Sequence, residues 1–435
     1  MKLILSRYRT LCSLLLWLLF AAPGFAQTNT TEFTINGLKV ILRQTQKETL
    51  VMSMYFRGGS SNYAPANAGI ESLALSGITD CGNSKYPASS FNDLVDDYGL
   101  HLTGAATNDY GMVKLSCISR YTDRAWNLFS SAITSPVFEI QKFNLLKEQK
   151  INDLKARMSN PDTRLERIAE EFAFARTPYS INPEGTVESL QALSRDAVKE
   201  YYYNTLLNKN RMFLVVAGNI SREDLEKKIG EAFSAVPAKE YSPAMIEAPL
   251  FNHETFTIES RPTATNYISG LLNAPGLSSP DYPAFRLSVS ILNSVLFEVI
   301  RLSKHLSYAP AATFSQGRIP YVTMYASTAQ PRETVKAMRS VLSYIKNTTY
   351  SNKTIESVRK GQALAYAKQQ EIMSDIVEQL GKAEIAGDWK LAENIGARMN
   401  EVTAEEIRTV LNTYAKNITW IYMGNPELGK QSFNQ

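Results

Sequence analysis

Apolar residues recur along the chain with two different spacings. One set follows the helical spacing of i, i+3, i+4 and i+7, which indicates amphipathic helices with one buried face. Short apolar runs bounded by turn residues indicate strands instead. These patterns predict helices near 125–133, 140–158, 335–345 and 354–374, and strands at 31–43, 50–56, 102–106, 111–116, 212–217 and 418–423.

The order of these elements repeats after about 206 residues. In each half a helix precedes an apolar strand, and the two strands end on Gly218-Asn219 and Gly424-Asn425. The second of these helices opens with Thr403 and Glu406, which have the spacing of a capping box. Strands mixed with helices, without regular βαβ alternation, favour the α+β class. We therefore predict two homologous halves, each an antiparallel-rich mixed sheet with helices packed on one face.

Neighbouring strands are predicted to form hairpins. The strands at 31–43 and 50–56 would pair across a turn near 44–49, and 102–106 would pair with 111–116. Prolines and charged residues interrupt all periodicity between 236 and 251. We predict a domain boundary there, with an N-terminal domain over 27–240 and a C-terminal domain over 250–435.

The first 26 residues have the pattern of a secretory signal peptide. Lys2, Arg7 and Arg9 precede an apolar run of about a dozen residues, which is too short to span a bilayer comfortably. Gly24-Phe25-Ala26 then provides a cleavage site of small residues. The alternative is a retained membrane anchor. We predict cleavage after residue 26, export of the mature chain, and no membrane anchor afterwards.

Charge and cysteine content narrow the possible partners. The net charge is +4, and three of the positive charges lie in the signal segment, which leaves about +1 in the mature chain. Such a balance does not attract nucleic acid or an anionic membrane. Cys81 and Cys117 remain after cleavage. An oxidising compartment would let them pair if they are close, but two buried free thiols are equally compatible with the sequence.

Several segments, in order and spacing, resemble the pitrilysin, insulinase and mitochondrial processing peptidase family, the inverzincins. The resemblance extends over nearly the whole mature length and implies two peptidase-like domains. In a bacterium, export would place such a protein in the periplasm. The matching segments are Asn36–Val40, Phe56–Ser60, Asn67–Ile70, Gly185–Leu190 and Leu193–Asn219.

The zinc motif of that family is replaced in this chain. Active members carry H-x-x-E-H, in which two histidines bind the metal and the glutamate is the general base. The register of the resemblance places Ser72 and Ser76 at the histidines and Leu75 at the glutamate. The third ligand position falls on Asp153 rather than glutamate. Glu71, beside the motif, reads as a solvated or capping carboxylate. We expect the chain to hold no metal or cofactor of its own.

The second half keeps another feature of the family. Arg301 and Tyr308 stand seven residues apart, and the resemblance implies that such a pair holds the substrate backbone and steadies the oxyanion formed at a distant zinc. A guanidinium offers a fixed fork of donors, and a phenol can donate to an oxyanion. From the residues alone, a solvated arginine and a core tyrosine are the alternative.

The resemblance implies a non-catalytic subunit of a heterodimeric zinc peptidase. A related partner would carry H-x-x-E-H and the zinc, and endopeptidase activity on peptides or unfolded polypeptides would exist only in the complex. One alternative is a peptide-binding or scaffold protein without an enzymatic partner. Another is an autonomous metallopeptidase with displaced ligands, which a metal assay would reveal. The sequence does not specify the substrate, the partner or homodimerisation.

Overall fold

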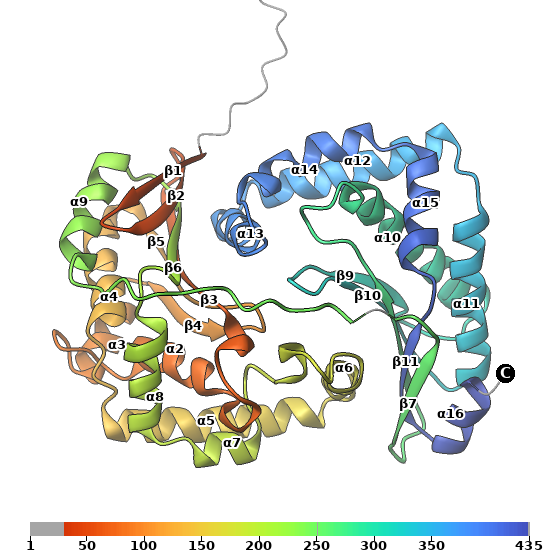
Figure 1. Cartoon of the computed structure of the whole chain (residues 1–435), viewed down its shortest axis with the longest axis horizontal. Coiled ribbons are helices and arrows are strands. Elements are labelled where there is room, and N and C mark those ends of the chain that lie inside the picture. The colour runs from red at the N-terminus through yellow and green to blue at the C-terminus, as the bar shows by residue number, and fades with distance from the viewer. Residues whose placement is uncertain (1–29, 250, 434–435) are drawn as a thin grey trace, which may run out of the picture.

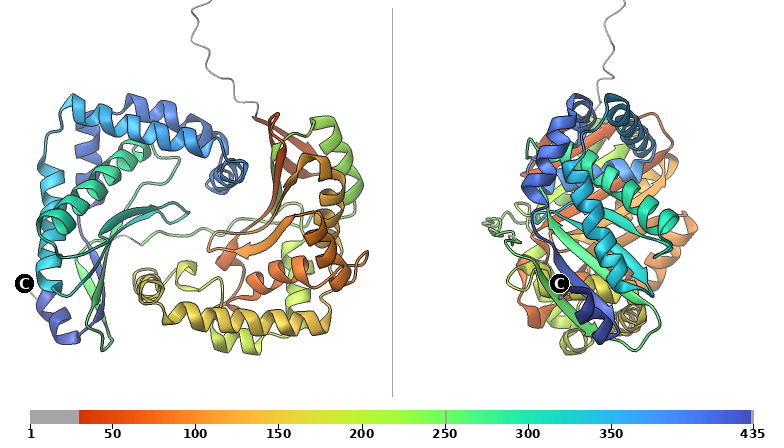
Figure 2. Two further views of the ribbon diagram at one scale, coloured as in Figure 1. Left: turned by 180° about the vertical axis from the view of Figure 1, so that it is seen from behind. Right: turned by 90° about the vertical axis from the view of Figure 1, so that its right-hand side faces the viewer.

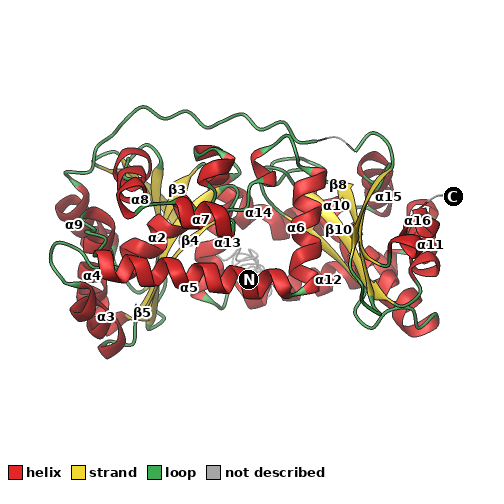
Figure 3. Cartoon of the chain, turned by 90° about the horizontal axis from the view of Figure 1, so that it is seen from below, coloured by secondary structure: helices red, strands yellow, loops and turns green. Residues whose placement is uncertain are grey.

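A computed structural model describes residues 30–249 and 251–433. The predicted signal segment, residues 1–26, lies outside the described residues. The chain forms two parts, each built on one twisted sheet, and a connection without helix or strand over 237–249 runs along one side from one part to the other (Figures 1 and 3). The predicted α+β class with two similar halves is confirmed.

Sheet 1 belongs to the first half and has six strands in the order β1-β2-β6-β3-β5-β4. All neighbours are antiparallel except β2 and β6. The prediction that 31–43 pairs with 50–56 is wrong, because β6 lies between β2 and β3. Asn36 and Gly37 instead fold 30–44 into a hairpin of its own, with left-handed φ values of 49° and 84°. The strands are β1 (Thr30–Ile35), β2 (Leu38–Gln44), β3 (Thr49–Arg57), β4 (His101–Ala106), β5 (Tyr110–Ile118) and β6 (Met212–Gly218).

Sheet 2 belongs to the second half and has five strands in the order β7-β11-β8-β10-β9. Its one parallel pair is β7 with β11, which matches the place of β2 with β6 in sheet 1. The predicted repeat is therefore visible in the topology. The strands are β7 (Thr255–Ser260), β8 (Asn266–Asn273), β9 (Ala311–Ser315), β10 (Tyr321–Thr328) and β11 (Thr419–Gly424).

Each sheet buries one face under helices of its own half. In sheet 1 these are α2 (Ile70–Asp80), α3 (Ala88–Asp97), α4 (Thr122–Thr134), α5 (Ile140–Ser159), α7 (Val187–Ala192), α8 (Arg195–Tyr201) and α9 (Arg222–Phe233). In sheet 2 they are α10 (Tyr282–Leu296), α11 (Pro331–Asn347), α12 (Asn352–Gln369), α14 (Lys390–Glu401), α15 (Ala404–Tyr414) and α16 (Pro426–Phe433). The two helix layers form the outer sides of the molecule (Figures 1 and 2).

The opposite face of sheet 1 is covered by a helix from the second half. Successive strand residues point to opposite faces, and the central strands are apolar on both. Val40 and Leu42 join the core under the helices of the first half, whereas Ile41 points to the other side. There α13 (Met373–Ile385) buries Val377 and Leu380 against the sheet.

Helix α13 lies unusually close to the sheet. A Cβ built at Gly381 would be 2.1 Å from the ring of Tyr55, so glycine is needed where the helix crosses this side chain. The Tyr55 hydroxyl donates to the carbonyl of Val377 at 3.2 Å. Sheet 1 is thus closed on both faces only because the second half supplies α13.

The exchange is reciprocal. Helix α6 (Pro161–Ala173) belongs to the first half by sequence, yet Leu165 and Ile168 pack against Leu271 and Ile421 of sheet 2. Ion pairs add to this contact, including Arg164 with Glu259. The helix predicted over 140–158 is confirmed as α5. It runs toward the second half, and α6 begins where it ends (Figure 1). Each half therefore packs one of its helices on the sheet of the other half, α6 on sheet 2 and α13 on sheet 1.

Two further predictions can be compared with the structure. The helix predicted over 354–374 is two helices, α12 and α13, separated by 370–372. Cys81 and Cys117 are both buried free thiols, so they form no disulfide. Within the described part of the chain, one helical stretch, Tyr282–Ser303, is long and apolar enough to cross a membrane, and 56% of its most apolar window is buried in the protein. It packs as a central helix of the second core.

Candidate functional site

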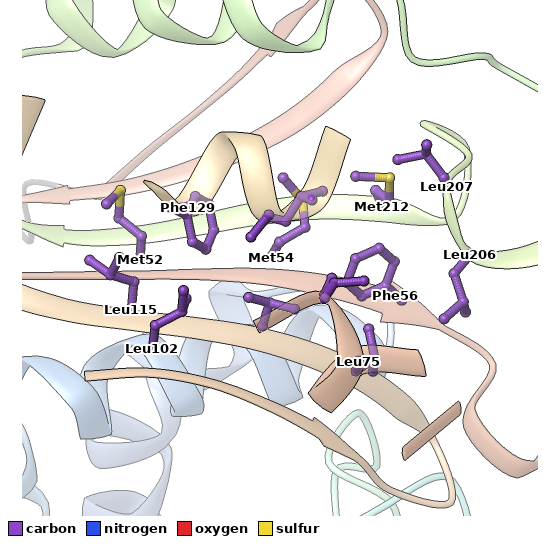
Figure 4. Close-up of a cluster of buried hydrophobic side chains, with 14 of the residues drawn as sticks. Met52, Met54, Phe56, Leu75, Leu102, Leu115, Phe129, Leu206, Leu207 and Met212 are labelled. Atoms are coloured by element: carbon purple, nitrogen blue, oxygen red, sulfur yellow. The ribbon is translucent and has the colours of Figure 1, made fainter. Parts of the chain in front are cut away.

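Helix α2 carries the three replaced positions of the zinc motif. Gly69, with a left-handed φ of 87°, starts the helix, and every residue from Ile70 to Thr79 is buried. Leu75, at the position of the general base, is fully buried. Figure 4 shows it within the apolar cluster that includes Phe56 and Leu102. The position that needs a carboxylate for catalysis is therefore part of the hydrophobic core.

Ser72 lies in a network of charged side chains. Its hydroxyl donates to Glu184 at 3.0 Å and accepts a hydrogen bond from the Lys150 ammonium at 2.8 Å. Lys150 and Glu184 also form an ion pair at 3.5 Å, with side chains 17% and 26% exposed. Lys150 comes from α5 and Glu184 from the loop before α7. The network therefore joins α2, α5 and this loop at a position that the resemblance assigns to zinc binding.

The residues at the ligand positions do not fit a zinc ion. Ser76 donates to the Gly104 carbonyl of β4 at 3.3 Å, and Asp153 is exposed on α5. The side chain of α5 that reaches Ser72 is Lys150, whose positive charge would repel a metal cation. Among residues 30–249 and 251–433, no group of three or more His, Cys, Asp and Glu side chains could hold a metal.

Glu71 is not the solvated or capping residue that the sequence suggested. It is fully buried, and one carboxylate oxygen accepts hydrogen bonds from the Tyr201 hydroxyl at 2.6 Å and the Asn62 amide at 3.1 Å. Burial raises its pKa to about 7, although these two hydrogen bonds and the charge of Arg211 act in the opposite direction. The second carboxylate oxygen is buried without a hydrogen-bond partner among the described residues.

Glu71→Gln is expected to change the pH dependence of stability. A carboxyl whose pKa is higher in the folded than in the unfolded protein favours folding at low pH, and this contribution is lost as pH rises from about 4.5 to about 7. The glutamine variant has no titrating carboxyl at this position, so its stability does not fall over this pH range for this reason. Its free energy of unfolding relative to wild type should therefore increase by roughly 3 kcal/mol between pH 4.5 and pH 8. Urea denaturation across this range measures it, with the exposed Glu148→Gln as control. A difference that does not vary with pH would contradict the assignment.

Arg301 and Tyr308 are brought together by the end of a helix. Helix α10 continues into a wider turn, η6 (Phe297–Ser303), which contains Arg301. His305 then adopts a left-handed φ of 52°, and the Leu306 N–H donates back to the Ile300 carbonyl at 2.8 Å. This bond spans six residues, and it closes the wide turn at the end of the helix. It reverses the chain and places Tyr308 on Arg301, with the guanidinium carbon 4.0 Å from the ring centre.

The Arg301 guanidinium also lies over the ring of Phe297, at 5.0 Å. Tyr308 is 78% exposed and Phe297 is 38% exposed, so neither is a core residue. Within the described part of the chain Arg301 makes no hydrogen bond or ion pair. Two aromatic contacts of this kind hold a guanidinium in place, and its N–H groups remain free to bind another molecule.

The sequence predicted the Arg301–Tyr308 pair but not the contact of Lys150 with Ser72 and Glu184. The Arg301–Tyr308 pair was identified from the family resemblance of the short continuous segment that contains both residues. Lys150 was not found, because its partners Ser72 and Glu184 are 78 and 34 residues away in sequence. A lysine on α5 with an acid in the segment before Gly185 is the signal that could have suggested the network.

The fold consists of two similar α+β halves, and Ser72, Leu75 and Ser76 on α2 are not the side chains that a zinc motif at these positions would need. Residues 192–361 match the family model described as "Peptidase M16 inactive domain". This segment includes α8, β6 and the strands and helices that lead to Arg301 and Tyr308. The match confirms the predicted resemblance to the pitrilysin, insulinase and processing peptidase family and covers 192–361 of the chain.

Two characterised relatives and a solved structure are similar to the chain. "Non-peptidase homolog YmxG" of Helicobacter pylori is 22% identical over 294 residues, which cover 66% of this chain and 67% of that protein. Cytochrome b-c1 complex subunit 1 of Saccharomyces cerevisiae is 24% identical over 268 residues, which cover 60% of this chain and 56% of the relative. The crystal structure of a peptidase M16 inactive domain from Pseudomonas fluorescens superposes with a TM-score of 0.81 at 18% identity, over 91% of this chain and 98% of that one. At this identity the structural likeness shows the fold alone.

Proposed function

We propose that this chain is the non-catalytic subunit of a heterodimeric zinc peptidase. It supplies Arg301 and Tyr308 to a related partner that carries H-x-x-E-H and the zinc. The observation that carries the proposal is the contrast between the two halves. In the first half, Leu75 is buried at the position of the general base and Lys150 contacts the position of the first histidine, whereas Arg301 in the second half is fixed between two exposed rings with free donors.

The chemistry of the pair supports a role in binding the substrate backbone. A guanidinium with free N–H groups can donate to a peptide carbonyl, and a phenol can donate to the oxyanion that forms when water attacks that carbonyl. Neither group can activate the water, so a zinc-bearing partner is required. That one relative is named as a subunit of a larger complex supports an assembly of this kind. The signal-like residues 1–26 support an extracytoplasmic location, which in a bacterium is the periplasm.

Copurification with a metal assay tests this proposal. An affinity-tagged chain, isolated from its native source, is expected to bring down a related H-x-x-E-H protein with near one zinc per heterodimer. The chain alone should contain less than about 0.1 zinc. An internally quenched, unstructured peptide should be hydrolysed by the mixture and by neither subunit separately. Stoichiometric zinc on the isolated chain would refute the proposal. Absence of any zinc-bearing partner would favour the scaffold or peptide-binding alternative.

A further inference from the structure

A pocket of 610 Å³ lies where α5 and α6 meet, and the segment that leads into α7 closes its third side. Figure 3 shows α6 turned steeply away from the end of α5, with α7 beside α5. All residues that line this α5–α6 pocket belong to the first half, and none lies on a strand. Its volume is in the range of pockets that bind small molecules. It is therefore separate from the Arg301–Tyr308 pair and large enough for a ligand.

One part of the lining is apolar. Leu154 of α5 is 5% exposed, and Met158 and Val187 are half-buried against the first core. Ile181 and Ala68 add to the same lining. A ligand that covers these side chains removes apolar surface from water, which favours binding. The pocket therefore fits a ligand with an apolar body.

The walls of the pocket are held in place without a ligand. Gly185 has a left-handed φ of 89°, and a Cβ there would lie 2.9 Å from the carbonyl oxygen of Ala68. The Ser189 hydroxyl donates to the same oxygen at 2.8 Å. On the opposite wall, Arg167 is 7% exposed and donates to the carbonyl of Ser180. A pocket that is already ordered loses little conformational entropy when it binds.

The two arginines in the lining are neutralised by carboxylates. Arg164 donates to Glu259 at 3.0 Å, and Arg167 pairs with Glu171 at 3.0 Å. Lys155, by contrast, is exposed and makes no hydrogen bond or ion pair within residues 30–249 and 251–433. An ammonium group has three donors and no acceptor, so it remains available to an anion.

The other charged residue of the lining, Glu188, is bound to the start of its own helix. Its own N–H and the Thr186 hydroxyl donate to its carboxylate and lower its pKa. Lys155 is therefore the charged group of the lining that lacks a partner. An anionic head group would form a charge-assisted hydrogen bond with it.

We propose that the α5–α6 pocket binds a small amphiphilic anion, such as an aliphatic or aromatic monocarboxylate. Its apolar body lies on Leu154, Met158 and Val187, and its carboxylate pairs with Lys155. The pocket is complete within one chain, so this binding does not require the zinc-bearing partner. Failure of the proposal is therefore distinct from failure of the proposed peptidase assembly.

The test is a fluorescence titration of the purified mature chain with anilinonaphthalene sulfonate, an apolar aromatic body that carries one sulfonate. Saturable binding at one site per chain is expected. Octanoate should displace the probe. Octanol, which has the same chain length and no charge, should displace it about tenfold more weakly, because it forms no ion pair with Lys155.

Substitutions of Lys155 test the head group. Lys155→Gln should weaken binding of the probe and of octanoate about fivefold and leave the affinity for octanol within about twofold of wild type. Lys155→Arg keeps the charge and should stay within about twofold for both ligands. Lys142→Gln is the matched control, because Lys142 is an exposed cation earlier on the same helix.

Val187→Trp tests the apolar part, because the larger ring fills the pocket. It should weaken binding of octanoate and octanol alike, by at least about tenfold. Circular dichroism and urea denaturation verify that the variant folds. Absence of saturable binding to the wild-type chain would overturn the proposal, as would binding that Lys155→Gln and Val187→Trp both leave unchanged. Equal affinity of the wild-type chain for octanoate and octanol would overturn it without any variant.

Discussion

Arg301→Ala is expected to lower the kcat of the assembled peptidase by about 10²-fold while leaving the heterodimer intact. The guanidinium is fixed by the rings of Tyr308 and Phe297, so its donors are oriented before the substrate binds. Its loss removes a donor that acts most strongly when negative charge forms on the carbonyl oxygen. Tyr308→Phe keeps the ring under Arg301 and removes only the hydroxyl, and a fall of similar order is expected if this hydroxyl donates to the oxyanion.

The measurement is steady-state kinetics with the zinc-bearing partner, together with size-exclusion chromatography to verify assembly. Lys304→Ala is the matched control, because Lys304 is an exposed cation three residues from Arg301. It should retain kcat within about twofold. Wild-type activity in both Arg301→Ala and Tyr308→Phe would remove the role assigned to the pair, even if the heterodimer forms.

Leu380→Ala is expected to destabilise the whole chain by about 2–5 kcal/mol. Leu380 is 2% exposed and packs from α13 into the cluster on sheet 1 with Val51, Val215 and Trp389. The substitution removes three buried carbons from a contact that joins the halves. Both halves should therefore lose stability, although the residue belongs to the second by sequence.

Urea denaturation followed by tryptophan fluorescence measures this effect. Trp126 lies in the first core and Trp420 in the second, so variants that keep one or the other report each half separately. Both midpoints should shift together. Leu364→Ala is the matched control, because Leu364 is 58% exposed on α12, and its effect should stay within about 0.5 kcal/mol. A shift confined to the second half would show that α13 does not hold sheet 1.

The α+β class and the repeat of two similar halves could be predicted from the sequence, because both depend on the local spacing of apolar residues. The stripes at 125–133 and 335–345 became α4 and α11, and the capping box at Thr403 is present in α15. Strand neighbours were harder to predict. β6 lies between β2 and β3, although it begins 155 residues after the end of β3, and local spacing does not indicate such pairing. The apolar residues on both faces of β6 were the available signal that a second helix layer covers sheet 1.

In the candidate site too, features within one short segment were predictable, whereas contacts between distant segments were not. Arg301 and Tyr308 were predictable as a pair because the family resemblance is carried by one short continuous segment. The partners of Ser72 were not, because Lys150 and Glu184 meet it only through packing of α5 and the loop before α7. Glu71 was misread for a related reason: a charged residue next to a motif is usually solvated, and its partner Tyr201 is 130 residues away in sequence.

The burial of Leu75 makes the replaced motif costly to reverse one residue at a time. Leu75 is fully enclosed, and a Cβ at Gly111 would lie 2.4 Å from one of its methyl groups. A reversion to glutamate would place an unpaired carboxylate in this space, at a cost of several kcal/mol, before any metal could stabilise it. Histidine at position 72 would meet the Lys150 ammonium. No single reversal therefore restores a metal site, because leucine fills the position of the general base and a lysine contacts the position of the first histidine.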